Sequence, residues 1–270
     1  MTSGIHPPFR GLSEALVDLP RYANTFQIFI RNNRNMKMRN FSQAEIDAFN
    51  YNLLNSQVCD YVIHASYSMN PASYDERILE NSRNAIKEDM ELLSKLARRK
   101  YYVLHPGAAK DMPDNMAIGM LSETLHKLQP YYRGTKVCLE TMAGQGTQLL
   151  WNLEQLQMLY EDCKDIPEFA FCIDTCHVFA AGMDVTKLSE WLWSIGSNRI
   201  GVVHMNGSQA AAGSRVDRHA NLTDGRLPRH VNAQMVYSLT KDNCTVPIIL
   251  ETPEARIEQD YDWLYHWLQH

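Results

Sequence analysis

Six short apolar runs along the chain each end in a residue that can bind a metal ion. The residues that follow these runs are His64, His105, Glu140, Asp174, His204 and Glu251. They recur at intervals of 30 to 47 residues, about the length of a strand followed by a helix. Because the carboxyl ends of parallel strands meet at one face of a barrel, we expect the six side chains to converge there.

Three carboxylates brought together repel one another, and a bound cation removes that repulsion. Imidazole and carboxylate ligands without thiolate suit Zn²⁺ or Mn²⁺ at a catalytic site.

Two further motifs add ligands. In CIDTCH, His177 follows Asp174 by three residues, where we expect the strand to run into a loop; in GSRVDRH, Asp217 and His219 are two apart and share a face of an extended loop.

The candidate ligands therefore number nine: His64, His105, Glu140, Asp174, His177, His204, Asp217, His219 and Glu251. A mononuclear site needs three or four ligands, so nine predict two or three ions. Clustered ions of this kind serve in-line attack on a phosphodiester.

Other segments near these residues have compositions suited to a nucleic acid. The basic segment after the second apolar run, with Arg31, Arg34, Lys37 and Arg39, should lie on the same rim and could grip phosphates, although a solvated loop has the same composition. Tyr67 could stack on a base or fill a gap in a duplex, and a packed loop tyrosine is the alternative. The glycines of 144–146 could leave backbone N–H groups free for an anion.

The elements that must position these side chains alternate between buried strands and amphipathic helices. The apolar runs are continuous, which indicates strands buried on both faces of a parallel sheet. We expect strands at 1–6, 27–30, 61–63, 101–104, 137–139, 169–173, 201–203 and 247–250. We expect helices at about 42–54, 74–97, 115–128, 152–159, 186–195, 230–240 and 257–268. The predicted fold is α/β, a (β/α)8 TIM barrel formed by 1–270 as a single domain, with the metal site at the C-terminal rim.

Composition excludes several classes of protein. Of the 270 residues 45% are hydrophobic, which excludes disorder, and no apolar run approaches the ~20 residues of a membrane span. The N-terminus has no secretory signal, so we expect an intracellular protein. The six cysteines are scattered without a C-x-x-C pair and predict buried thiols. The net charge of −5 opposes nucleic-acid binding, but three divalent ions would more than offset it.

At these residues the chain resembles the endonuclease IV family of apurinic/apyrimidinic (AP) endonucleases. The motifs that carry the resemblance, from about His6 to Glu251, are IHASY, LHPG, CLETMAGQGT, CIDTCHVFAAG, HMNGS, GSRVDRHANLTDG and ILETP. The resemblance implies a TIM barrel with three Zn²⁺ ions that cleaves duplex DNA 5′ to abasic sites. It implies products with a 3′-hydroxyl and a 5′-deoxyribose phosphate, and trimming of blocked 3′ ends as a second activity. We expect a monomer.

The resemblance also implies a role for each residue that matches a motif. His64 and His105 would hold one zinc, and Glu140 would bridge it to a second. Asp174, His204 and Glu251 would complete the second site, and His177, Asp217 and His219 would hold the third ion. Glu140 and Glu251 would be the catalytic carboxylates. The residues expected to contact DNA are Arg34, Tyr67 and Ser68.

The chain departs from the family at three places. Ser68 stands where the family often has a bulky aliphatic residue after the tyrosine that acts as a minor-groove wedge. Gly207 replaces the usual aspartate after H-x-N. His6 keeps the histidine of the family's start, as a rim residue without an assigned role, although Pro7 and Pro8 after it are unusual.

Two other functions fit part of the pattern. A metal-dependent sugar isomerase or epimerase of the same barrel architecture explains Glu140, Asp174, His204 and Glu251, but it leaves His177, Asp217 and His219 unexplained. A catalytically silent DNA-binding barrel that uses the basic segment predicts binding of abasic DNA without cleavage, and intact ligands argue against it.

Overall fold

The computed structural model describes residues 2–7, 11–12, 14–17, 19–241, 243 and 245–269 of the chain. Eight parallel strands lie side by side in the order β1-β10-β7-β6-β5-β4-β3-β2. They are β1 (Thr2–Ile5), β2 (Gln27–Phe29), β3 (Asp60–His64), β4 (Arg99–Leu104), β5 (Lys136–Glu140), β6 (Phe169–Asp174), β7 (Ile200–His204) and β10 (Pro247–Leu250). All eight predicted strands are confirmed within a residue or two, except that Met1 lies outside the described residues.

The two ends of this sheet approach each other between β1 and the segment that leads into β2. The backbone N–H of Ser3 donates to Asn24 Oδ1 (2.8 Å), and the N–H of Asn24 donates to the carbonyl of Ser3 (3.2 Å). A Cβ on Gly4 would lie 1.9 Å from the carbonyl oxygen of Thr25, so only glycine permits this approach. The strands therefore form the nearly closed TIM barrel that the sequence predicts.

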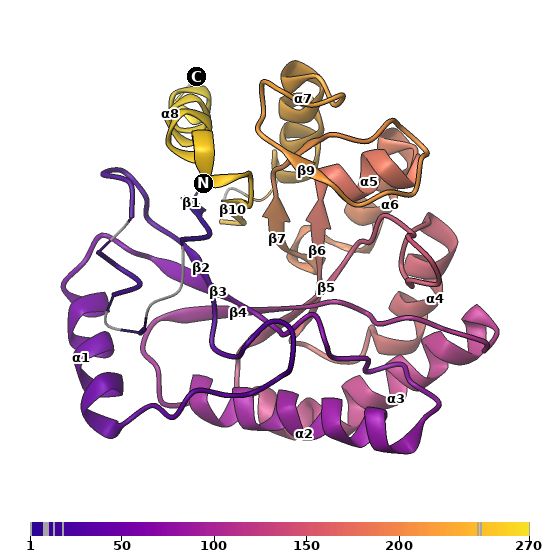
Figure 1. Cartoon of the computed structure of the whole chain (residues 1–270). Helices are drawn as coiled ribbons and strands as arrows, with labels where there is room; N and C mark the ends of the chain where they lie inside the picture. The colour runs from indigo at the N-terminus through magenta and orange to yellow at the C-terminus, as the bar shows by residue number, and fades with distance from the viewer. Residues whose placement is uncertain are drawn as a thin grey trace.

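Helices surround the strands on the outside (Figure 1). They are α1 (Gln43–Leu54), α2 (Glu76–Leu93), α3 (Asp114–Tyr132), α4 (Leu153–Cys163), α5 (Thr175–Ala181), α6 (Val185–Ile195), α7 (Arg229–Thr240) and α8 (Ile257–Leu268). Ser42 and Glu45 form the predicted capping box, and Asn152 accepts the N–H of Gln155 at the start of α4. None of the helices in the described part of the chain has the length and apolar character that crossing a bilayer requires.

Two local predictions are wrong, and one element was not predicted. The helix expected at 74–97 ends at Leu93, because the chain turns at Arg98 (φ 65°) to enter β4. The expected loop after Asp174 is helix α5, which Asp174 itself caps. A two-stranded hairpin, β8 (Gly207–Ser208) with β9 (His219–Ala220), carries the loop that contains Asp217.

The interior of the barrel is filled mainly by small and medium side chains, together with Tyr101. Cys138 and Cys172 lie in this inner cluster with Val62, Val103 and Val202. The cysteine prediction holds for Cys138, Cys163, Cys172 and Cys176, but Cys59 is exposed and Cys244 lies outside the described residues.

Candidate metal centre

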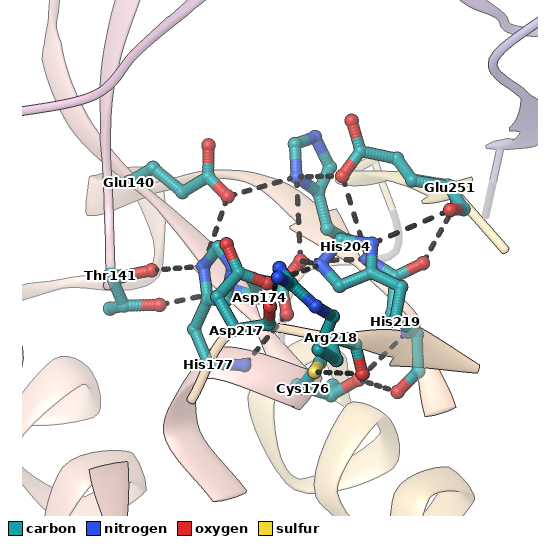
Figure 2. A network of polar contacts seen from close by, with 12 residues as sticks. Glu140, Thr141, Asp174, Cys176, His177, His204, Asp217, Arg218, His219 and Glu251 are labelled. Atoms are coloured by element: carbon teal, nitrogen blue, oxygen red, sulfur yellow. Dashed lines mark hydrogen bonds and ion pairs between the residues drawn. The ribbon is translucent and has the colours of Figure 1, made fainter. Parts of the chain in front are cut away.

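The structure brings all nine predicted ligands together at the carboxyl ends of the strands. Figure 2 shows those around Glu140, Asp174, His177, His204, Asp217, His219 and Glu251. Their ligand atoms form three groups, and within each group the atoms lie within 4.8 Å of one another. The groups are His64, His105 and Glu140; Glu140, Asp174, His204 and Glu251; and His177, Asp217 and His219. Six of the nine lie at or directly after the ends of β3, β4, β5, β6, β7 and β10, and helix α5 and the β8–β9 hairpin supply the other three.

Glu140 occupies the centre of the cluster and is 1% exposed. Its Oε2 lies 3.2 Å from Nε2 of both His64 and His105, and its Oε1 lies 3.5 Å from Nδ1 of His204. Burial alone would raise the pKa of Glu140, but the imidazoles of His105 and His204 hold it well below its usual range. A single ionised carboxylate therefore belongs to two of the three groups.

The imidazoles are oriented by acceptors that fix which nitrogen carries the proton. Nδ1 of His64 donates to the carbonyl of Ala65, Nδ1 of His177 to that of Thr141, and Nε2 of His204 to the side-chain oxygen of Gln27, each at 2.8 Å. The other nitrogen of each of these rings faces the carboxylates of the cluster.

Three ring nitrogens of the cluster are buried without a hydrogen-bond partner in the described part of the chain: His177 Nε2, His204 Nδ1 and His219 Nε2. Yet His177 Nε2 lies 3.2 Å from Asp217 Oδ2, and His204 Nδ1 lies 3.2 Å from Glu251 Oε2. A ring nitrogen that faces a carboxylate at this distance needs a positive charge beside it, which either a proton on the ring or a bound metal ion supplies. The donor set therefore fits divalent ions with nitrogen and oxygen ligands.

The pKa shifts in the group formed by Glu140, Asp174, His204 and Glu251 also favour a bound cation. Burial lowers the pKa of His204, but the carboxylates of Glu251 and Glu140 raise it overall to about 9. Burial raises the pKa of Glu251, but the imidazole of His204 holds it well below its usual range. Figure 2 shows the carboxylates of Glu140 and Glu251 on either side of the His204 ring. Without metal the group holds protons, and a metal ion would displace them.

Two cysteines lie close to the ligands. The thiol of Cys172 lies near Glu140 and His204, and the thiol of Cys176 lies near Asp174 and His219. Burial raises the pKa of Cys176 to about 12 and that of Cys172 well above its usual range. Since the thiolate is the form that binds metal, the oxygen and imidazole ligands dominate the site.

The loop that carries Asp217 is held by the segment after Glu140. Gln145 Oε1 accepts the backbone N–H of Asp217 (3.1 Å), and Arg215 Nε donates to the carbonyl of Gly144 (2.8 Å). The guanidinium of Arg215 also lies 4.0 Å from the ring centre of Trp151. The prediction of an anion site at 144–146 is wrong at Gln145, whose N–H donates to Gln148.

Sequence reasoning missed two buried amides that support the ligands. Gln27 Nε2 donates to Glu251 Oε1 (2.5 Å), and Asn206 Nδ2 donates to Asp174 Oδ2 (2.7 Å). Both residues are fully buried. The available signals were a glutamine at the start of an otherwise apolar strand and the asparagine of HMNGS.

The basic segment divides into a buried and an exposed part. Arg31 is buried, with Nε 2.6 Å from Asp89 Oδ1 and Nη2 2.7 Å from Glu88 Oε2. The prediction that Arg31 belongs to a phosphate-binding patch is therefore wrong, because Asp89 and Glu88 already pair with its guanidinium. Arg34 and Lys37 are exposed on the loop above it.

Tyr67 and Ser68 lie beside the cluster. The ring of Tyr67 is 47% exposed and stacks on His105, with ring centres 5.0 Å apart. Tyr67 lines a hollow of about 450 Å³ together with most of the nine ligands, Gln148 and Arg218. Ser68 is half-buried and its Oγ donates to the carbonyl of Asn33 (3.4 Å).

Close packing of the backbone explains why residue 207 is a glycine. A Cβ at this position would lie 2.6 Å from the carbonyl oxygen of Asn221 and 2.8 Å from that of Ala220. The close pairing of β8 with β9 therefore excludes any side chain at residue 207.

The barrel and its clustered rim ligands define the class of protein. The sequence profile of the family described as "Xylose isomerase-like TIM barrel" matches residues 23–267, and the chain belongs to that family.

Within this class the chain belongs to the endonuclease IV family. "Probable endonuclease 4" of Finegoldia magna is 32% identical over an alignment of 240 positions that covers 86% of this chain and 83% of that protein. "Probable endonuclease 4" of Mycoplasmoides gallisepticum is 35% identical over 72% of this chain and 65% of that protein. The crystal structure of endonuclease IV from Thermus thermophilus superposes with a TM-score of 0.78 at 28% identity and covers 100% of this chain and 99% of that one.

Proposed function

We propose that this protein is a zinc-dependent AP endonuclease. It hydrolyses the phosphodiester 5′ to an abasic site in duplex DNA and leaves a 3′-hydroxyl and a 5′-deoxyribose phosphate. Three Zn²⁺ ions, with Mn²⁺ as a partial substitute, occupy the three ligand groups. Trimming of blocked 3′ ends is a second activity of the same site.

One observation carries the proposal: two ligand groups share the buried carboxylate of Glu140, and the third lies beside them. His177 Nδ1 lies 3.2 Å from Glu140 Oε1, while its Nε2 reaches Asp217, so this ring links the third group to the centre. Ions held this close suit a phosphodiester, whose attacking, leaving and non-bridging oxygens all need charge stabilisation.

The chain's own residues then have distinct tasks. Bound zinc would supply Lewis-acid stabilisation of the phosphate and activation of a water molecule. Glu140 and Glu251 would be ligands to the ions, and the carbonyls of Ala65 and Thr141 hold His64 and His177 in the ligating tautomer.

The contacts with DNA belong to the exposed rim. Arg34 stands on the exposed loop after β2, where it binds phosphate or enters the duplex near the lesion. Tyr67 and Ser68 form a wedge beside the cluster, and the small Ser68 makes it smaller than that of the family. A missing base makes kinking of the duplex cheaper, which favours the abasic site. The protein acts as a monomer.

The test is cleavage of an end-labelled duplex with one tetrahydrofuran abasic analogue, without added magnesium. We expect a cut 5′ to the analogue that leaves a 3′-hydroxyl, is lost on prolonged chelation and returns with Zn²⁺. The undamaged duplex controls for specificity. Glu140→Gln should abolish cleavage, whereas Glu161→Gln, at an exposed carboxylate of α4 paired with Lys164, should cleave normally. Failure of the folded, zinc-replete protein to cut would overturn the proposal.

A further inference from the structure

His6 lies at the same rim as the nine ligands but is not one of them. It follows β1, and its Nδ1 lies 3.0 Å from Gln27 Nε2 and 3.5 Å from Glu251 Oε1. Its ring packs 4.8 Å from that of Phe29. Nothing in the proposed function assigns this histidine a task.

A chain of hydrogen bonds fixes the tautomer of His6. Because His204 turns Nδ1 toward Glu140 and Glu251, its Nε2 carries the proton and donates to Gln27 Oε1. The amide nitrogen of Gln27 must then be the end that faces Glu251 and His6. An amide nitrogen only donates, so Nδ1 of His6 accepts and its Nε2 carries the hydrogen.

This N–H is accessible from a second hollow. His6 lines a hollow of about 340 Å³ with Pro7, Phe29 and Glu254, and the hollow adjoins the metal cluster because Tyr67, His219 and Glu251 line both. The Nδ1 edge of the His6 ring faces buried groups, and the side chain is 15% exposed. Within the described part of the chain Nε2 makes no hydrogen bond, and the partly exposed ring lines the hollow, so a ligand in the hollow can reach this N–H.

We propose that His6 is a substrate-contacting residue: its Nε2–H donates to an oxygen of the DNA backbone that lies across the metal cluster, and Gln27 holds the required tautomer. The inference rests on the proposed function. A phosphate oxygen and a deoxyribose oxygen both accept from N–H, and the experiment distinguishes these two sources.

Two substitutions of His6 separate its hydrogen bond from its shape. His6→Phe keeps a ring against Phe29 but has no N–H, and His6→Gln places an amide NH₂ close to the position of Nε2. We expect kcat/KM on the abasic duplex to fall about 10- to 100-fold in His6→Phe. We expect His6→Gln to recover part of that loss. His126→Phe, on the outer helix α3, is the matched control and should cleave like the wild type.

Gln27→Glu tests the relay. A glutamate keeps an acceptor for His204 but cannot donate to His6 or to Glu251. The part of its effect that passes through His6 should vanish in the His6→Phe background, so Gln27→Glu should lower kcat/KM less there than in the wild type. Zinc content and melting temperature are measured for every variant. A purely structural role would lower the zinc content of His6→Phe together with its activity, whereas a substrate contact leaves three ions per chain.

The source of the oxygen is identified with modified duplexes. The penalty of His6→Phe is its fall in kcat/KM relative to the wild type on the same duplex. If the acceptor is a phosphate, this penalty disappears on a duplex with one methylphosphonate at the contacted position. If it is the sugar hydroxyl, the penalty appears on natural abasic DNA and disappears on the tetrahydrofuran analogue. A penalty that persists on every such duplex overturns the contact.

Two failures are distinguishable. If the zinc-replete wild type does not cleave, the proposed function and this inference both fall. If the wild type cleaves and His6→Phe matches it, or if His6→Phe loses zinc in proportion to activity, only the role of His6 is overturned.

Discussion

Zinc binding to this cluster should release protons, and the number released follows from the structure. The carboxylates hold the pKa of His204 at about 9 and that of His177 well above its usual range, so both rings are protonated at pH 7 in the metal-free protein. Glu140 and Glu251 have lowered pKa values and are already ionised. Metal must therefore displace about two protons from these rings, which weakens the apparent zinc affinity about 100-fold for each unit of pH lowered.

The assay is titration calorimetry of the chelated protein with Zn²⁺ in buffers of different ionisation enthalpy. The slope of the observed enthalpy against the buffer's enthalpy gives the number of protons, and we expect about two at pH 7. His204→Asn should reduce that number by about one. A slope of zero, or one that His204→Asn leaves unchanged, would refute the reasoning.

The same shift fixes the sign of a stability effect. The pKa of His204 is raised above its unfolded value of 6.5, so its contribution to the stability of the metal-free protein is full below pH 6.5 and is lost as the pH rises through about 9. A shift of this size corresponds to roughly 3 kcal/mol. Urea unfolding of the chelated protein at pH 6 and pH 9 measures it. Zinc-loaded protein should not show this dependence.

Three further outcomes concern stability and metal content, and a fourth concerns DNA binding. Asp217→Asn should remove one of three zinc ions by metal analysis and lower cleavage at least 100-fold, whereas a sugar isomerase would keep most of its activity. Arg31→Met leaves the buried carboxylate of Asp89 without its cation and should cost about 3–5 kcal/mol in urea unfolding, and a change below 1 kcal/mol would contradict the buried pairing. Gly207→Asp should lower the melting temperature, because the side chain collides with the backbone of β9, and an unchanged value would contradict that packing. Arg34→Ala should weaken DNA binding and reduce its salt dependence, and an unchanged salt slope would remove Arg34 from the phosphate contacts.

The sequence by itself determined the barrel and its rim. Continuous apolar runs are the pattern of parallel strands buried on both faces, and each run ends at a polar residue one βα unit from the next. That regularity predicts six ligands on one face, because the topology of a parallel barrel carries every strand end to the same side.

Tertiary structure decided which polar residues are free to act. Arg31 and Arg34 look alike in sequence, yet their surroundings differ. Asp89, 58 residues from Arg31, pairs with the guanidinium of Arg31, whereas Arg34 is exposed. Gln27 stands out as a polar residue at the start of an apolar strand, but the sequence does not show that its amide reaches both His204 and Glu251, 177 and 224 residues away. Such pairings depend on contacts between distant segments, and local periodicity carries no information about them.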